Sequence, residues 1–542
     1  MRLRSKLCGG SLRLAIAASV ALPSMLLSQE HEHKHNLGQL GRVVFPVSCT
    51  PAAQQRFEHA MAVLHSFWWE EGDRAFGDVL AADSTCTMAY WGIALNAWGN
   101  PFAGGPTGDV LGKGATAAER ASALSVRTSR ERGFVAATAA LYRDAALTPN
   151  SARLQAYADT MARLHRQFPK DVEVAIYYAL GQLATAPKTD TTFAQQRRAI
   201  AILDPLYARH PNHPGLAHYV IHASDSPRLA HLGLSAARRY SQIAPAAPHA
   251  QHMPSHIFVR LGLWNETIAS NWKSYHAGES YAKAMKRPGA PEELHALDYA
   301  VYGYLQRGQD SAARAAVTEG GKVKTDSRAL VASYNRTAMA ARIPLERGDW
   351  AAAAAFPMPA DSLAPIATAL ARFTRAIGSA RSGRPEGAGP EVKALDSIAT
   401  ALEAKGEPYW SRVVHIKHDA AEAWLRFASG DTTRALELGR AAADSEEVTD
   451  KHPVTPAELL PARELEGDML LLAGRHPEAR AAYRATLARE RNRGRSLFGM
   501  ARAAELAGDR QTAASDYRKF LELMAKADGD RTEVATAKAF SY

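Results

Sequence analysis

Histidines concentrate in one stretch of this chain. Eight of its twenty histidines lie between His210 and His256, a stretch of 47 residues in which an even distribution would place fewer than two. Histidine titrates near neutral pH and is the commonest protein ligand for transition metals. Crowded imidazoles repel one another once protonated, so such a cluster indicates a use for the uncharged rings. The candidate chemistry of the chain lies in this stretch.

The first candidate pair is His218 and His222. The two residues are four apart in a segment, 215–223, whose composition predicts a helix, so both rings lie on one helical face. Helices chelate metal ions with this spacing. Asp225 follows and offers a carboxylate as a further ligand. It also precedes a Ser226-Pro227 pair typical of a helix start, and a structural role at this helix turn is the favoured interpretation.

A second candidate group consists of His249, His252 and His256, at offsets of three and four. Pro254 lies inside this group, and a proline breaks or kinks a helix that contains it. We therefore expect a helix to start at Pro254, with His249 and His252 in the lead-in. Loop residues also bind metals, so all three histidines remain candidate ligands.

Further candidates lie one repeat away or have structural explanations. His295 and Asp298 share a face of the next predicted helix and are possible additional ligands, because corresponding faces of consecutive repeats stack side by side. His210 and His213 are expected in an exposed loop, and His231 on a helix surface. Three interpretations stay open: a bound transition metal, a polar groove without metal, and structural histidines. For a metal, imidazole and carboxylate ligands suggest zinc, copper(II) or iron(II).

The elements that position these histidines are predicted to be helices arranged in repeats. A glycine–alanine–tyrosine pattern recurs after 34 residues. It occurs first at Gly474, Ala479 and Tyr483, and again at Gly508, Ala513 and Tyr517. Glycine can adopt the positive φ of a tight turn between paired helices, and a small alanine lets two backbones approach. The same glycine–alanine offset occurs earlier, at Gly308 with Ala313, Gly348 with Ala353, and Gly430 with Ala435.

This period and these positions resemble the tetratricopeptide repeat. Near the N-terminus, Tyr90-Trp91-Gly92 followed by Ala94-Leu95 is similar to its first-helix signature, with Ala75 at the helix-crossing position. The resemblance runs in degenerate form from about Pro51 to Met524 and implies an all-α fold, a tetratricopeptide-like helical-repeat superhelix (an α–α solenoid) with a concave groove. HYVIHASD and APHAQHMPSHIFVRLG also resemble exported bacterial tetratricopeptide-repeat proteins of uncharacterised activity, which offer no catalytic residues to transfer.

Composition divides the chain into segments. Residues 1–28 are predicted to be a signal peptide, 29–48 a histidine-containing linker, 49–383 degenerate repeats with the histidine cluster, and 391–542 the C-terminal repeats. Glycine and proline predict a loop or lid at 99–114 and linkers at 384–390 and 451–456.

The N-terminus and the cysteines indicate an exported protein. Arg2, Arg4, Lys6 and Arg13 precede the apolar run 14–27, a pattern typical of a secretory signal peptide. No second long apolar run follows, so we expect no membrane span in the mature chain, which would be periplasmic or extracellular. In an oxidising compartment Cys49 and Cys86 are expected to form a disulfide, with two free buried thiols as the alternative.

Several classes of function are disfavoured. The net charge of +10 is scattered, and its arginine clusters lie among glutamates, so no nucleic-acid partner is predicted. His31 to His35 matches the HExxH pattern but stands beside the predicted cleavage site, where a catalytic helix is not expected. Ser255 lacks a GxSxG context. The aromatic run 67–69 and Trp98 could line a pocket, but the favoured interpretation is a thick core.

The leading hypothesis is an exported tetratricopeptide-repeat scaffold that binds a peptide or protein partner and has a histidine-lined groove for a divalent metal. One alternative is a metal-dependent enzyme of hydrolase or oxidase type that uses His218, His222, His249 and His252 around an open coordination position. The other is a purely structural repeat protein, in which replacing these histidines costs stability alone.

Overall fold

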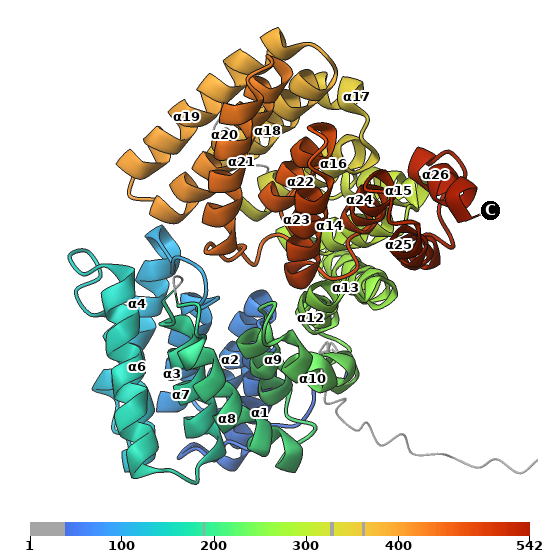
Figure 1. Ribbon diagram of the computed structural model, residues 1–542. Helices are drawn as coiled ribbons and strands as arrows, with labels where there is room; N and C mark the ends of the chain where they lie inside the picture. The colour runs from blue at the N-terminus through green and yellow to red at the C-terminus, as the bar shows by residue number, and fades with distance from the viewer. Residues whose placement is uncertain (1–37, 188–189, 326–329, 360–363, 542) are drawn as a thin grey trace, which may run out of the picture. The chain divides into compact units, whose positions relative to one another are not determined.

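The structure is a computed structural model that describes residues 38–187, 190–325, 330–359 and 364–541. Within these ranges the regular elements are helices and none is a strand (Figure 1), which confirms the predicted all-α class. No helix among the described residues is long and apolar enough to cross a membrane. The predicted signal peptide and the His31–His35 motif lie outside the described residues.

The helices follow one another with short connections. The first thirteen are α1 (Pro51–His65), α2 (Trp69–Ala82), α3 (Thr87–Trp98), α4 (Gly108–Ala123), α5 (Ser129–Tyr142), α6 (Asn150–Gln167), α7 (Val172–Ala184), α8 (Ala194–Arg209), α9 (Pro214–Ser224), α10 (Ala230–Ile243), α11 (Pro248–His252), α12 (Pro254–Leu261) and α13 (Trp264–Ala284).

The remaining helices complete the series. They are α14 (Pro291–Gln306), α15 (Asp310–Gly320), α16 (Leu330–Arg347), α17 (Trp350–Ala354), α18 (Pro365–Arg381), the 3-10 turn η1 (Pro385–Gly387), α19 (Ala388–Ala404), α20 (Pro408–Ala428), α21 (Thr432–Glu447), α22 (Ala462–Leu472), α23 (His476–Arg489), α24 (Gly494–Leu506), α25 (Arg510–Leu523) and α26 (Thr532–Ser541).

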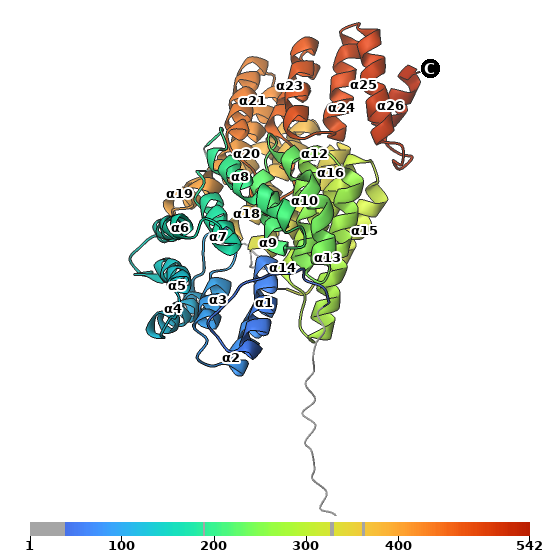
Figure 2. The ribbon, with the colours of Figure 1, turned by 90° about the horizontal axis from the view of Figure 1, so that it is seen from below.

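Each helix packs against the next throughout this series, and some also contact the helix two places on, as α14 does with α16. Figure 2 shows α21, α23, α24, α25 and α26 following one another in a row. Neighbour-to-neighbour packing of this kind defines a solenoid, in which each repeat buries its apolar face on the adjacent ones. The predicted tetratricopeptide-like α–α solenoid is confirmed.

The repeat residues have the predicted roles. Gly474 and Gly508 adopt φ of 75° and 83° in the α22–α23 and α24–α25 turns. Ala479 and Ala513 are fully buried where the paired helices cross. A Cβ on Gly499 would lie 2.4 Å from the ring of Tyr483, so this glycine lets α24 approach the aromatic side chain.

Three segments predicted as loops contain more structure than expected. The helix α4 begins at Gly108, so the loop predicted for 99–114 ends earlier, because Ala-rich sequence after the glycines favours a helix. The segment predicted as a linker at 384–390 forms η1 and the start of α19. The segment 451–456 has no helix, but Val454 and Thr455 are buried.

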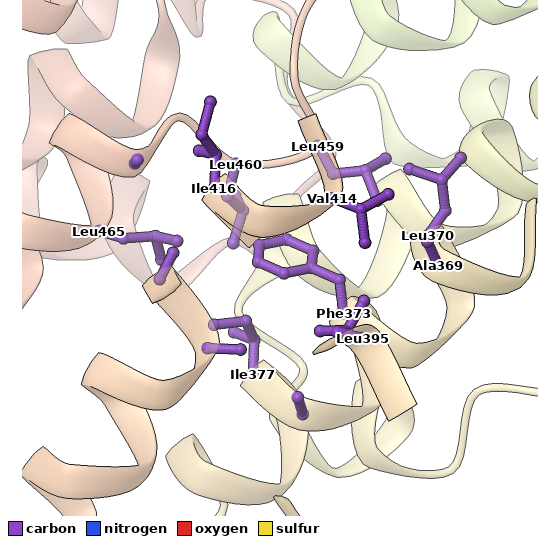
Figure 3. Close-up of a cluster of buried hydrophobic side chains, with 14 of the residues drawn as sticks. Ala369, Leu370, Phe373, Ile377, Leu395, Val414, Ile416, Leu459, Leu460 and Leu465 are labelled. Atoms are coloured by element: carbon purple, nitrogen blue, oxygen red, sulfur yellow. The ribbon is translucent and has the colours of Figure 1, made fainter. Parts of the chain in front are cut away.

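Apolar side chains from α16 to α22 form one continuous core. Figure 3 shows Phe373 of α18 between side chains that include Leu395 of α19 and Val414 of α20. Leu459 and Leu460, which precede α22, belong to the same cluster. The chain on both sides of 384–390 therefore shares buried surface.

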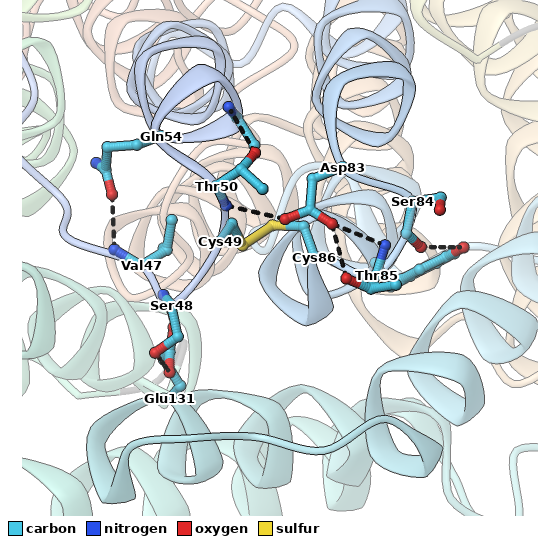
Figure 4. The surroundings of a disulfide bond; sticks show 12 residues. Val47, Ser48, Cys49, Thr50, Gln54, Asp83, Ser84, Thr85, Cys86 and Glu131 are labelled. Carbon is cyan, nitrogen blue, oxygen red and sulfur yellow. Dashed lines mark hydrogen bonds between the residues drawn. A yellow bond between two sulfur atoms is a disulfide. The ribbon is translucent and has the colours of Figure 1, made fainter.

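A disulfide joins Cys49 to Cys86, as predicted, and ties the start of α1 to the start of α3 (Figure 4). Asp83 lies beside it and accepts a hydrogen bond from the backbone N–H of Thr50 at 2.9 Å. Thr50 in turn caps α1. The chain-entropy model assigns about 4 kcal/mol to a bridge that closes a loop of this size.

Candidate metal centre

Six histidines of the predicted set converge on two groups of nitrogen atoms. The first triad is His218, His222 and His249, and the second triad is His252, His256 and His295. Helix α9 supplies two histidines to the first triad, and α12 and α14 each supply one to the second. The short helix α11 supplies one residue to each, His249 and His252.

Proline positions explain how the sequence builds this arrangement. Pro214, Pro248 and Pro254 each stand at the start of a helix, where the missing N–H costs nothing. The predicted helix start at Pro254 is confirmed. The predicted lead-in loop is wrong, because Pro248 starts α11. Met253 keeps helical angles between the two helices (φ −52°, ψ −36°), so the chain continues its turn across the junction.

The first triad has the spacing of a metal site. The Nε2 atom of His218 lies 3.0 Å from Nε2 of His222 and 3.1 Å from Nε2 of His249. Three nitrogens bound at about 2.0–2.1 Å to one tetrahedral zinc ion lie about 3.3 Å apart. All three nitrogens lie within 4.8 Å of one another, close enough for one ion to bind them together.

Hydrogen bonding fixes the tautomer of His218. Its Nδ1 lies 2.7 Å from the backbone carbonyl oxygen of His65, so Nδ1–H donates and Nε2 carries a lone pair. That single lone pair faces two imidazole nitrogens, and it cannot accept a well-aligned hydrogen bond from both. A cation at the common point would use the lone pairs of all three rings.

In the second triad every Nδ1 atom faces an oxygen acceptor. His252 Nδ1 lies 2.6 Å from Asn271 Oδ1, and His256 Nδ1 lies 2.8 Å from Asp225 Oδ2. His295 Nδ1 lies 3.0 Å from a backbone carbonyl oxygen, that of Val454. Ligating histidines are typically oriented in this way, with one ring N–H held by an amide or carboxylate oxygen and the other nitrogen directed at the metal.

The oxygen acceptors of His252 and His256 leave the Nε2 lone pairs of these two rings facing each other. Asn271 donates its own amide N–H to the carbonyl of Thr267 at 2.7 Å, which fixes its Oδ1 toward His252. Both His252 and His256 are therefore protonated on Nδ1, yet their Nε2 atoms lie 3.0 Å apart. Two neutral rings held in this way repel each other, whereas a bound cation would make the contact favourable.

The rings are held in the uncharged form that binds metals. Burial lowers the pKa of all six imidazoles, that of His252 to about 3. For five of them the next largest effect is the charge of a neighbouring histidine, which lowers the pKa further. For His256 the carboxylate of Asp225 opposes the effect of burial. Protons therefore compete weakly with a metal ion at neutral pH.

Asp225, the possible additional ligand, belongs to neither triad and contacts His256 and Arg260. It caps the C-terminal end of α9, in keeping with the favoured structural interpretation. One carboxylate oxygen accepts from His256 and the other accepts from Arg260 Nε at 2.9 Å. Burial opposes its ionisation, but Lys451, Arg260 and His256 together hold the pKa of Asp225 well below its usual value.

Asp298, the other possible additional ligand, also belongs to neither triad. Its carboxylate is fully buried and pairs with Arg342 at 2.8 Å. Arg342 also donates to the Thr455 hydroxyl and to the Ala457 carbonyl, at 2.9 and 2.8 Å. This pair therefore secures the segment that carries the Val454 carbonyl, the acceptor for His295.

A third group, the glutamate cluster, consists of His65, Glu173 and His213. His213 is buried as the N-cap of α9, so its predicted place in an exposed loop is wrong. His213 Nδ1 accepts the backbone N–H of Leu216, and its Nε2–H donates to Glu173 at 2.9 Å. His65 Nε2–H donates to the other oxygen at 3.1 Å, and its Nδ1 accepts from the Tyr219 hydroxyl at 3.1 Å.

Aromatic rings cover the first triad. Phe67 lies 4.4 Å from the ring of His218 and 5.6 Å from that of His249, between ring centres. Phe102, from the glycine-rich loop before α4, lies 4.4 Å from His222. Trp98 is buried and, with Phe67 and Trp69, lines a small apolar cavity beside this loop, in keeping with the pocket interpretation of the aromatic residues. The loop at 99–107 therefore contributes an apolar wall to the first triad.

The comparisons with known proteins add little to this geometry. No protein-family model matches the chain, and no characterised protein matches it in sequence. Among solved structures, yeast Tom70 aligns with a TM-score of 0.29 and 9% identity, over 90% of this chain and 88% of its own. A chain of the Naa15/Naa10 complex bound to HypK-THB aligns with a TM-score of 0.22 and 12% identity, over 90% and 73%.

Proposed function

We propose that this protein is a helical-repeat metalloprotein that holds two transition-metal ions, one in each histidine triad. The observation that carries the proposal is the contact between His252 and His256. Their Nδ1 atoms are committed to Asn271 and Asp225, and their Nε2 lone pairs meet at 3.0 Å. A buried arrangement of this kind is unfavourable on its own and is favourable around a cation.

The donor set favours zinc, copper or iron. Imidazole nitrogen suits all three metals, whereas magnesium and calcium prefer oxygen ligands. Cys49 and Cys86 are joined in the disulfide and offer no thiolate. Each triad supplies three ligands, which leaves one tetrahedral position for a water molecule or an external ligand.

The repeat fold supports a role as a scaffold that presents these ions to a peptide or protein partner. Stacked helix pairs form extended surfaces that commonly bind such partners. We further propose that the protein is exported, acting in the periplasm or outside the cell. The basic N-terminus with its apolar run and the disulfide support this location.

Elemental analysis of the purified, untagged protein tests the metal proposal. We expect two equivalents of zinc, copper or iron in the wild type, one in His218→Ala, one in His252→Ala, and none in the double variant. His231→Ala is the matched control, because His231 is exposed on α10 and should leave both equivalents in place.

Two results would overturn the proposal. One is a wild-type protein that binds no metal after incubation with excess zinc, copper(II) or iron(II). The other is a double variant that retains the wild-type metal content. Either result, combined with a lower melting temperature of the variants, would favour the purely structural interpretation of the histidines.

A further inference from the structure

Lys451 is a buried cation close to the second triad. Its side chain is only 8% exposed, and its Nζ atom lies 3.8 Å from the Asp225 oxygen that holds His256. The same Nζ lies 6.0 Å from the ring centre of Tyr299. That ring packs against all three histidines of the triad, with ring centres 4.8, 5.2 and 5.1 Å apart.

The ammonium group of Lys451 has no hydrogen-bond acceptor among the described residues. Asp225 accepts from His256 and Arg260, and its nearer oxygen lies 3.8 Å from Nζ, beyond hydrogen-bond distance. The neighbouring cation differs, because Arg260 bonds to Asp225 and to Asp450. An ammonium group has three N–H donors, and leaving them unsatisfied in a buried position is costly.

Charged side chains lie close to the second triad. Asp225 and Asp450 pair with Arg260 and Lys451, and Glu446, Glu458 and Glu490 line the cavity beside Lys451. The three neutral imidazoles themselves offer no negative charge to the ion. Buried charges require compensation, and one coordination position of a three-histidine site is open. An anion at that position would serve both the ion and the unsatisfied ammonium group.

We propose that the ion of the second triad takes a carboxylate as its fourth ligand and that Lys451 donates a hydrogen bond to that carboxylate. This inference rests on the proposed function, because it requires the bound ion. The carboxylate belongs either to a small free acid or to the C-terminus of a peptide. Both sources offer the same oxygen donors. Among the described residues, no lysine shifts the pKa values of the three first-triad rings as Lys451 does those of the second triad.

Cobalt(II) provides the readout, because its visible absorption responds to a new ligand. The cobalt content is measured first and should be two equivalents. The loaded protein is then titrated with acetate, with acetyl-Ala-Ala-Ala, and with the same peptide amidated at its C-terminus. We expect the absorption to change with acetate or with the free-acid peptide, and the amidated peptide to be inert.

Variants of Lys451 test whether its ammonium group donates a hydrogen bond to the bound carboxylate. Lys451→Met should weaken carboxylate binding at least tenfold while keeping two equivalents of cobalt, and Lys451→Arg should retain most of the affinity. Lys405→Met is the control, because Lys405 is exposed after α19, and it should behave as the wild type. The same titration in His218→Ala assigns the response to the second triad.

The outcomes separate the two proposals. Two equivalents of cobalt with no response to acetate or to the free-acid peptide would overturn the carboxylate site and leave the metal sites standing. Unchanged carboxylate affinity in Lys451→Met would also overturn the role of Lys451. A protein that binds no cobalt, zinc, copper or iron would overturn the proposed function and this inference together.

Discussion

The glutamate cluster and the second triad are both compact groups of buried metal-ligand residues, but their hydrogen bonds differ. In the glutamate cluster, each ring nitrogen of His65 and His213 has a matching donor or acceptor. In the second triad, one nitrogen of each ring is matched, and the Nε2 atoms of His252 and His256 meet as two acceptors. Proximity of ligand residues is therefore weaker evidence for a metal than an unmatched set of lone pairs.

The comparison predicts which cluster needs a cation. Glu173 is held ionised, because the two histidines outweigh the effect of burial and lower the pKa of its carboxyl. The glutamate cluster thus supplies its own negative charge to the N–H groups around it. Among the described residues, both triads consist of histidines alone and contain no carboxylate. The proposed function therefore places a cation there.

Metal removal should have the largest effect on the stability of the protein. At a free metal concentration a thousandfold above the dissociation constant, one bound ion adds about 4 kcal/mol to the free energy of unfolding. We expect EDTA to lower the melting temperature of the wild type and of Glu173→Gln, and to leave that of His218→Ala/His252→Ala unchanged. An equal shift in the double variant, measured by calorimetry, would contradict the assignment of the triads.

The substitution Glu173→Gln should have the next largest effect on the stability of the protein. The amide would present N–H to one histidine N–H and would lose two charge-assisted hydrogen bonds, so we expect a loss of about 3 kcal/mol of stability. Both metal equivalents should remain. Chemical denaturation gives the stability and elemental analysis gives the metal content. If the metal were lost while stability was retained, the glutamate cluster would have been misassigned as structural.

Asn271→Ala should weaken the second site without removing it. Loss of an outer-shell acceptor typically reduces metal affinity ten- to a hundredfold. We expect an effect in this range on the second equivalent only, measured by competition with a chromophoric chelator. Asn271→Asp, which keeps an oxygen acceptor for His252, serves as the control and should retain more of the affinity. An equal loss at both sites would indicate a general disturbance of the fold.

Tyr219→Phe should have the smallest effect. It removes the hydroxyl that donates to His65 in the glutamate cluster, a single hydrogen bond worth about 1 kcal/mol. The metal content should not change, because the His65 carbonyl that orients His218 belongs to the backbone. A melting curve and an elemental analysis suffice. Loss of the first-triad ion in this variant would show that the two regions are not independent.

Much of the fold could be predicted from the sequence because the repeat signals are local. The 34-residue period and the turn glycines specify helix pairs that contact their chain neighbours, and Gly474 and Gly508 have the expected positive φ. Segments such as 451–456 were less predictable. Proline and the absence of helical periodicity suggested a linker there, but contacts with Arg342 hold Thr455 in a buried position.

The sequence also identified the histidines that converge, but it did not show that they form two separate triads. The four-residue spacing of His218 and His222 is readable, because one helical turn brings the rings together. The oxygen atoms that accept hydrogen bonds from the Nδ1–H groups could not be identified from the sequence. The carbonyl of Val454 lies 159 residues from His295, and that of His65 lies 153 residues from His218. Contacts at such separations depend on how the repeats stack, so the sequence alone left Asp225 and Asp298 as candidate ligands.

The helix α11 links the two triads, since its five residues supply His249 to one and His252 to the other. An ion in the first triad would restrain His249, and with it the backbone that carries His252 one helical turn away. The residual motion of α11 is then lost once, at the first binding event, and the second ion binds to a helix that is already more restrained. Occupancy should therefore rise cooperatively, so that the protein passes from empty to full over a narrow range of free metal concentration.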